Sequence, residues 1–276
     1  MPLHDTQAFV LRTYKLAEAD KICVFLTRNY GKVRGVAYGA RKMRSRFGSS
    51  LEQFTELSLT YFQKEGRDLV SVSGAEIVRS HFNESAGSVQ AGAAMSYIAD
   101  LLCEFLPDHE PNETIYRLVG ATTDAFGKGV DLNALVRYFE IWLLKLAGFY
   151  PDLRQCAVCS GAMPPDGEVW LSSEGSPRCR DCSSGRGIRV DRRIRDTLAR
   201  ALAEPPARFA AEPPSDEVLD RFAEIALSII RHSLERDLKS FAIFNRLRRE
   251  MDARVEPAPR IGSDEQQVVE MPITDP

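Results

Sequence analysis

Histidine is scarce in this 276-residue chain, and the common motifs of bond-making chemistry are missing from it. The four histidines, His4, His81, His109 and His232, have no chemically suitable neighbours in the sequence. There is no glycine-rich phosphate loop, no G-x-S-x-G turn and no H-E-x-x-H helix. These absences argue against a hydrolase or a nucleotide-driven enzyme, and we predict a protein that is not an enzyme.

Long apolar runs are missing too. No run approaches the roughly 20 residues that a membrane-spanning helix needs. The start of the chain is polar from Met1 to Asp5, and the apolar stretch Ala8–Leu11 is too short for a secretory signal. We therefore expect a cytoplasmic protein without membrane contacts, in which Cys23 and Cys103 are buried thiols. The length suits two modest domains.

Four of the six cysteines form two close pairs, Cys156-x2-Cys159 and Cys179-x2-Cys182, with nineteen residues between them. Two such pairs can supply four thiolates to one tetrahedral Zn²⁺. A glycine follows each pair within three residues and gives the backbone freedom to fold around a metal. The alternatives are two disulfides, which need an oxidising compartment, or a redox dithiol, which usually occurs in a βαβ setting. The spacing favours one zinc ion.

A zinc ion with four cysteine ligands has no open coordination position, so the predicted role is structural. Residues 150–190 are rich in loops and bury too little apolar surface to fold alone. Zinc binding contributes on the order of 10–16 kcal/mol in small structural sites. The metal therefore explains how this segment is held together, but it does not indicate what the protein does.

Charge is distributed unevenly although the net charge is only −3. Residues 1–80 contain 13 Lys/Arg and 8 Asp/Glu, whereas the rest of the chain contains 23 and 31. The stretch from Lys21 to Leu51 has no acidic residue. Surfaces that only face solvent normally mix both signs, so this stretch predicts a positive face for a polyanion. Its eight cations are Lys21, Arg28, Lys32, Arg34, Arg41, Lys42, Arg44 and Arg46.

Cationic residues are most closely spaced in the segment Gly39–Ser50 of this stretch. Cations there would neutralise phosphates and release counterions, a gain that is independent of nucleotide sequence and weakens with salt. No helix resembles a major-groove reader, so we expect little sequence specificity. A merely solvated loop is the alternative. The candidate nucleic-acid contacts of the loop are Arg41, Lys42, Arg44 and Arg46.

Three aromatic residues, Tyr30, Tyr38 and Phe47, lie in or beside the basic stretch. Aromatic rings interleaved with cations can stack unpaired bases. For Tyr38 and Phe47, packing against the end of a barrel is an equal alternative. A second basic group follows the cysteines, with Asp191 and Asp196 interspersed, so a mixed surface is as reasonable there as a second phosphate contact. That group is Arg186, Arg189, Arg192, Arg193 and Arg195.

The first 80 residues contain five short β-rich runs, which predict a five-stranded barrel of the OB-fold, with an SH3-like barrel as the alternative. The basic loop falls between the third and fourth runs. The runs are Thr6–Tyr14, Lys21–Thr27, Lys32–Ala37, Phe54–Gln63 and Asp68–Val78.

From about residue 84 the apolar spacing becomes helical. The expected helices cover residues 89–105, 113–127, 132–147, 191–204, 216–230 and 239–251. The proline-rich stretch 205–214 predicts a linker or wrapped loop, and Ser215 a helix N-cap. The predicted class is therefore α+β: an OB-fold in residues 1–80 and an α-helical domain in residues 81–250 with a four-cysteine zinc module inserted at 150–190. Residues 252–276 are predicted to be a disordered tail.

The order and spacing of these features resemble the RecO family of bacterial recombination mediators up to about residue 250. Where that family often has proline before the phenylalanine that opens the fourth strand, this chain has Gln53. The matching stretches are Ala8–Leu11, Phe25–Thr27 with Tyr30–Val33, Gly39–Arg41 with Ser45, Leu51–Thr55, Arg137–Glu140, Leu146–Phe149 with Cys156, and Leu238–Ser240.

The resemblance implies an OB-fold followed by a helical domain with a zinc module, and a role in homologous-recombination repair through the RecF pathway. Such proteins bind single- and double-stranded DNA, anneal complementary strands, cooperate with RecR, contact the C-terminal tail of the single-stranded DNA-binding protein and help RecA replace it. This implies a cytoplasmic, nucleoid-associated protein.

Carried onto this chain, the DNA contact falls on the four loop cations, with Lys32 and Arg34 on the adjoining strand. The tail pocket is expected in the helical domain, where a basic residue borders an apolar groove. A zinc-containing RNA-binding or transcription-associated adaptor is the alternative function.

Overall fold

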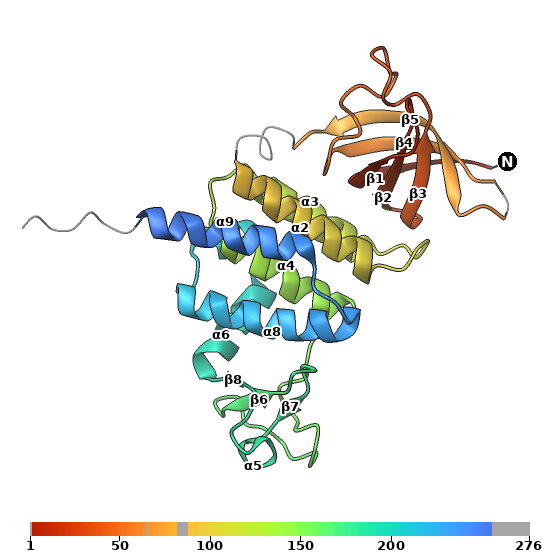
Figure 1. Ribbon diagram of the computed structural model, residues 1–276. Coiled ribbons are helices and arrows are strands. Elements are labelled where there is room, and N and C mark those ends of the chain that lie inside the picture. The colour runs from red at the N-terminus through yellow and green to blue at the C-terminus, as the bar shows by residue number, and fades with distance from the viewer. Residues whose placement is uncertain (1, 65, 82–87, 256–276) are drawn as a thin grey trace, which may run out of the picture.

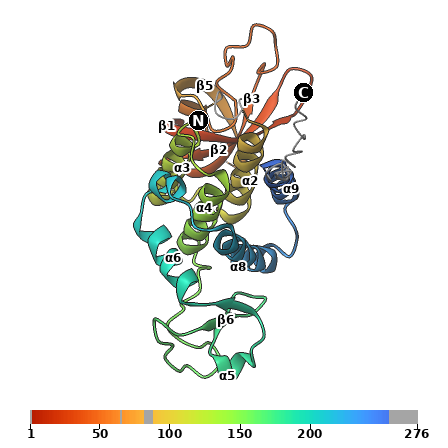
Figure 2. The ribbon, with the colours of Figure 1, turned by 90° about the vertical axis from the view of Figure 1, so that its left-hand side faces the viewer.

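Three tiers follow one another in the computed structural model, which describes residues 2–64, 66–81 and 88–255. A β-barrel forms one end, helices form the middle, and a small three-stranded module forms the other end (Figures 1 and 2). None of the helices in these described ranges is long and apolar enough to cross a membrane. The predicted tail at 252–276 overlaps the last helix, which continues to Val255, and residues 256–276 lie outside the described ranges.

The barrel contains five strands and closes in the order β1-β2-β3-β5-β4, with β4 paired back to β1. Only the β3–β5 pair is parallel among these strands. This arrangement confirms the predicted five-stranded OB-fold and does not support the SH3-like alternative. The strands are β1 (Leu3–Lys15), β2 (Lys21–Thr27), β3 (Gly31–Ala37), β4 (Glu56–Phe62) and β5 (Leu69–Arg79).

Alternation along β1 sends side chains to two different cores. Ala8 and Val10 point into the barrel, where they join one buried apolar cluster. Phe9 and Leu11 point outward and belong to the core of the helical tier. Because one strand contributes to both cores, the barrel is packed firmly against the helices.

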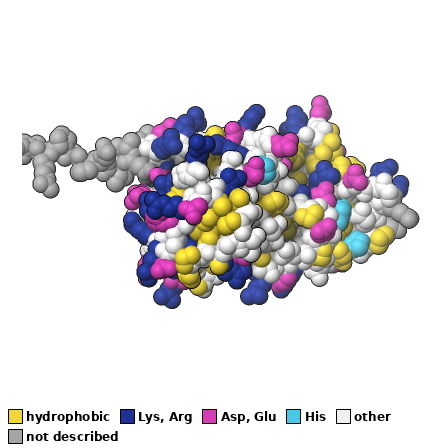
Figure 3. All heavy atoms as spheres, turned by 90° about the horizontal axis from the view of Figure 1, so that it is seen from below, with side chains coloured by type: hydrophobic (Ala, Val, Ile, Leu, Met, Phe, Trp, Pro, Cys, Tyr) yellow, Lys and Arg dark blue, Asp and Glu magenta, His cyan; other side chains and the backbone are white. Residues whose placement is uncertain are grey.

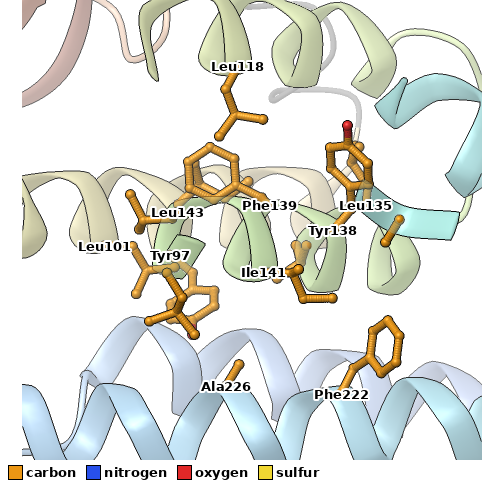
Figure 4. Close-up of a cluster of buried hydrophobic side chains, with 14 of the residues drawn as sticks. Tyr97, Leu101, Leu118, Leu135, Tyr138, Phe139, Ile141, Leu143, Phe222 and Ala226 are labelled. Carbon is orange, nitrogen blue, oxygen red and sulfur yellow. The ribbon is translucent and has the colours of Figure 1, made fainter. Parts of the chain in front are cut away.

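Seven helices of the described chain form or flank the middle tier: α2 (Val89–Phe105), α3 (Glu113–Phe126), α4 (Leu132–Leu146), α6 (Arg192–Ala203), α7 (Pro206–Ala211), α8 (Asp216–Leu234) and α9 (Lys239–Val255). Ser88, Asn112, Asp131 and Asp191 start four of them, and each side chain accepts a hydrogen bond from the backbone N–H three residues later. Tyr97, Phe139 and Phe222 come from three different helices and are fully buried members of one apolar core (Figure 4).

One local prediction was wrong, and another was right in position only. The proline-rich stretch contains the helix α7, because Pro206 occupies a first-turn position where its missing N–H costs nothing. Ser215 starts α8, but its side chain does not cap the helix. Its hydroxyl instead accepts a hydrogen bond from Arg193 at 2.7 Å.

The far module contains β6 (Val169–Leu171), β7 (Pro177–Arg178), α5 (Arg180–Ser183) and β8 (Ile188–Val190), with strand order β7-β6-β8. Val169, Leu171 and Val190 are buried and continue the core of the helical tier into the module. Gly175, which has φ +79°, packs directly against Ile229 of α8, where an added Cβ would lie 2.5 Å from that side chain.

Candidate metal centre and nucleic-acid interface

The four paired cysteines lie together at the tip of the far module, around α5. Their sulfur atoms are all within 4.8 Å of one another, and the sulfurs of Cys159 and Cys179 are 4.0 Å apart. Zn–S bonds of about 2.3 Å in a tetrahedron place the sulfurs about 3.8 Å from each other. The quartet of Cys156, Cys159, Cys179 and Cys182 therefore fits a single tetrahedral metal ion.

The backbone around the quartet favours the thiolate form of Cys156. The N–H groups of Cys159 and Cys179 hydrogen-bond the Cys156 sulfur, the second at 3.3 Å, and they lower the pKa of Cys156 to about 6. Hydrogen bonds with the Cys179 and Cys159 sulfurs raise the pKa of Cys182 to about 12. Four thiols this close cannot all ionise without a compensating cation. A divalent metal supplies that charge and deprotonates its thiol ligands.

The turns that follow the two cysteine pairs differ in how they reverse the chain. After the second pair, Ser184 and Gly185 have positive φ of 51° and 70°, so the expected need for glycine holds there. After the first pair the left-handed residue is Ser160, with φ 56°, so the prediction that Gly161 supplies this freedom is wrong. Gly161 instead leaves room for the Cys159 sulfur, because an added Cβ would lie only 3.3 Å from that atom.

The basic loop between β3 and β4 projects from the end of the barrel that points away from the helices (Figure 1). Phe47 and Leu51, each 3% exposed, close this end of the barrel and anchor the loop. The cations that precede Phe47 in the loop face outward. All four loop cations, Arg41, Lys42, Arg44 and Arg46, are exposed.

The loop cations are not neutralised by acidic side chains. Arg41 donates to the backbone carbonyls of Ala17 and Glu18, both at 2.9 Å, and Arg46 donates to that of Val72 at 3.2 Å. Across the described ranges, no carboxylate lies within ion-pair distance of any of the four. Their charge therefore remains available to a polyanion.

Lys32 and Arg34 have a different environment from the loop. Both pair with Asp108 at 3.2 Å, and the Lys32 ammonium also donates to the Cys103 carbonyl at 2.6 Å. Lys32 lies near the start of β3, about 16 Å along the strand from its last residue Ala37. The structure thus places these two candidates at the junction with the helices, and it does not bring Lys32 together with the loop cations.

The same junction contains three more ion pairs between barrel cations and helix carboxylates. They are Arg12 with Asp100, Arg28 with Glu113, and Arg79 with Asp124. We call these pairs, together with those of Asp108, the charged seam. Part of the excess positive charge of the first 80 residues is therefore neutralised by ion pairs within the molecule. No local pattern in the sequence indicates these pairs, because the partners are up to 88 residues apart.

The three aromatic candidates differ in exposure and in their contacts. Phe47 is buried in the barrel end, whereas Tyr38 is 56% exposed. Tyr30 packs edge-on against His4, with ring centres 4.7 Å apart. Tyr38 is therefore the best placed of the three to stack a base. Tyr14, which was not singled out in the sequence, is 47% exposed on the outer face of β1.

The second basic group is largely structural. Arg192 pairs with Asp196 at 3.7 Å and Arg193 with Glu217 at 3.6 Å, and Arg189 pairs with Glu168. Arg195 donates to three backbone carbonyls and fastens the module to α6. Seen from the module's end, cationic and acidic side chains are interspersed (Figure 3). The mixed-surface interpretation is the better one.

Comparisons with known proteins agree with this architecture. The family model described as Recombination protein O N terminal matches residues 1–81, and that described as Recombination protein O C terminal matches residues 87–242. The DNA repair protein RecO of Koribacter versatilis (strain Ellin345) is 30% identical over 247 residues, which are 89% of this chain and 99% of the relative.

Two further relatives carry the same name. The DNA repair protein RecO of Anaeromyxobacter sp. (strain K) is 33% identical over 232 residues, or 83% of this chain and 91% of the relative. That of Bifidobacterium animalis subsp. lactis (strain AD011) is 35% identical over 206 residues, or 74% and 84%. With both halves of the chain matched and the barrel of the expected topology, the chain belongs to the RecO family of DNA repair proteins.

Proposed function

We propose that this protein is a recombination mediator that binds single- and double-stranded DNA through the basic loop, anneals complementary strands and helps RecA load onto protein-coated single strands. Its family and the name of its relatives support a role in DNA repair. The observation that carries the proposal is the loop itself, in which four exposed cations lie beside an OB barrel with no carboxylate of the described chain paired to them.

The proposed activity needs no bond chemistry. Binding two strands through their phosphates reduces their mutual repulsion and raises their local concentration, which favours pairing. The free energy comes from binding and base pairing, so no nucleotide site is required. The proposed partners are RecR, the C-terminal tail of the single-stranded DNA-binding protein and, through them, RecA, all in the bacterial cytoplasm at the nucleoid.

For the metal centre we propose one structural Zn²⁺ bound by Cys156, Cys159, Cys179 and Cys182. Four thiolates in a tetrahedral arrangement are the ligand set that zinc and iron prefer. All four positions are filled by protein, so such a metal binds no substrate. Its role is to hold a module whose strands are only two or three residues long.

The test replaces the four loop cations with alanine and measures DNA affinity against salt concentration. Each lost phosphate contact reduces the slope of log affinity against log salt by about 0.7 to 0.9, so the full variant should lose about 3 from the slope. At 0.15 M salt this corresponds to roughly 100- to 1,000-fold weaker binding. Annealing of complementary strands should slow in parallel.

The matched control removes four exposed arginines that are already paired with carboxylates. Arg154, Arg192, Arg193 and Arg246 serve this purpose, since each has an acidic partner. The control changes the net charge equally and should leave slope and annealing nearly unchanged. A folded loop variant that binds and anneals like the wild type would overturn the proposed function.

A further inference from the structure

A cleft of about 580 Å³ lies on the outer face of the barrel, where β1, β2, β3 and β5 meet the connection between α2 and α3. Its floor is apolar and consists of Ile22, Val24 and Leu69. Tyr14 flanks the floor and is 47% exposed. The volume is within the range of about 300–1,000 Å³ that small-molecule sites cover. Neither the family match nor the loop accounts for this cleft.

The charges in the cleft do not suit a phosphate. Lys32 and Arg34 share one carboxylate, Asp108, at 3.2 Å, which offsets one of their two positive charges. With Asp68 counted, the charged residues of the lining sum to zero. Asp68 adds a second, exposed carboxylate to the lining, and no cation of the described chain pairs with it. An apolar floor, an aromatic ring and a free carboxylate instead match a nucleobase, which has flat apolar faces and polar edges.

The cleft and the basic loop are linked through the connection that follows β1. The Arg41 guanidinium donates to the carbonyls of Ala17 and Glu18, in the connection that follows β1. Tyr14 lies three residues before Ala17, so at most about 10 Å of chain separates the two. Tyr38, 56% exposed, directly follows the last residue of β3 and precedes the basic loop. A strand whose phosphates lie on the loop can therefore direct its bases toward Tyr38 and Tyr14.

We propose that this cleft takes unpaired nucleobases, stacked on Tyr14 with Tyr38 as a second platform, and thereby gives the barrel a preference for single strands. The proposal rests on the proposed function, because the loop must hold the phosphates. The bases of a duplex are paired and stacked inside the helix and cannot enter. The OB-fold supports this placement, since the face of strands two and three with the adjoining loops is where such barrels generally bind oligonucleotides.

The Asp68 carboxylate should make the cleft prefer some bases over others. Carboxylates accept hydrogen bonds from exocyclic amino groups such as that of cytosine. Thymine lacks an amino group, and its ring N–H lies between two carbonyl oxygens that a carboxylate repels. The cleft should therefore favour cytosine over thymine, and the Asp68→Asn variant should lose much of this difference.

The experiment compares Tyr14→Ala with Tyr14→Phe, which keeps the ring and removes only the hydroxyl. Binding is measured by fluorescence anisotropy to four probes of equal length: an oligodeoxycytidine, an oligodeoxythymidine, an abasic strand and a blunt duplex. Stacking on an aromatic residue is worth about 5- to 150-fold in affinity per base. We expect such a loss for Tyr14→Ala on the two base-bearing strands, none on the abasic strand or duplex, and no loss for Tyr14→Phe.

A second measurement reports stacking directly. The fluorescence of 2-aminopurine in a single strand should be quenched by the wild type and by Tyr14→Phe, and much less by Tyr14→Ala. Because Tyr14 is half-exposed, its replacement should leave thermal unfolding unchanged. Replacing Val158, which is 61% exposed on the metal-binding module, with alanine is the control for loss of an exposed apolar side chain.

The outcomes separate this proposal from the proposed function. If Tyr14→Ala loses affinity equally for all four probes, or for none of them, the proposal that the cleft binds bases is wrong. The loop variant still tests separately whether the loop binds phosphates. If the loop variant binds every probe like the wild type, the proposed function fails, and the cleft proposal fails with it. An unaltered cytosine preference in Asp68→Asn would remove the role of that carboxylate.

Discussion

Replacing Glu140 with glutamine tests which of two opposing effects is larger in the core of the helical tier. Glu140 and Arg137 lie on α4 with side chains 0% and 1% exposed. The Tyr97 hydroxyl donates to Glu140 Oε1 at 2.7 Å. Arg137 Nη1 is 3.0 Å from Oε2, but neither atom has a well-directed hydrogen bond. Burial opposes the ionised carboxyl, whereas the nearby guanidinium favours it.

Burial is the larger effect and raises the pKa of Glu140 to about 7, although Arg137 and the Tyr97 hydroxyl both act to lower it. In the unfolded chain a glutamate has a pKa of about 4.3. The folded state therefore holds its proton more tightly, and stability present at low pH is lost as the pH rises toward and through 7. The two pKa values differ by about 2.7, which corresponds to about 3 to 4 kcal/mol.

Glutamine cannot ionise and still offers an oxygen to the Tyr97 hydroxyl. Glu140→Gln should therefore be more stable than the wild type by about 3 to 4 kcal/mol at pH 8 and by no more than about 1 kcal/mol at pH 5. Urea unfolding of both proteins from pH 5 to 8 measures the difference, in which other titrating groups cancel. Glu113→Gln, at an exposed carboxyl paired with Arg28, is the control and should show no such trend. A variant less stable than the wild type at pH 8 would show that the attraction of Arg137 outweighs burial.

Two further predictions concern the metal module and the barrel junction. The wild type should contain one zinc per chain by elemental analysis, and Cys156→Ser should lose it and lower the unfolding temperature of the helical tier more than that of the barrel; metal-free protein purified under reducing conditions would contradict this. Gly31→Ala should cost clearly more stability than Gly66→Ala in chemical unfolding. Both glycines have positive φ, of 66° and 73°, but an added Cβ at Gly31 would lie 2.3 Å from the Glu110 carbonyl oxygen, whereas Gly66 has nothing within 4 Å. If the two substitutions lowered the free energy of unfolding equally, the connection between α2 and α3 would be able to shift and make room for the added Cβ.

Features that depend on local sequence were predictable. The bounds of β2 are Lys21–Thr27 as expected, because β-branched and apolar residues are enclosed by turn residues. The start of α4 follows from Asp131, whose side chain accepts from the Ala134 N–H at 2.6 Å. The cysteine quartet assembled as its spacing indicated, since two short knuckles need only one hairpin between them to bring four sulfurs together.

Features that depend on contacts between distant segments were not predictable. Nothing around Lys32 in the sequence indicates that Asp108 lies beside it, and nothing around Tyr14 indicates a cleft. Both arise because the connection between α2 and α3 packs on the outer face of the barrel, where the Asp108 backbone bridges to Lys32. The exposure of the loop cations was easier to predict, because a loop that closes the end of a barrel keeps its charged side chains in solvent.

The division of charge between seam and loop leads to a quantitative expectation for DNA binding. Of the eight cations in the acid-free stretch, Arg28, Lys32 and Arg34 are paired with carboxylates of the helical tier, on α3 and on the connection between α2 and α3. If all eight met phosphates, the slope of log affinity against log salt for duplex DNA would be about −7, whereas five give about −4.5. We expect the smaller value for the wild type, and Arg28→Ala should leave it unchanged. A wild-type slope near −7, or a shallower slope in Arg28→Ala, would mean that the seam opens when DNA binds and releases its cations to the phosphates.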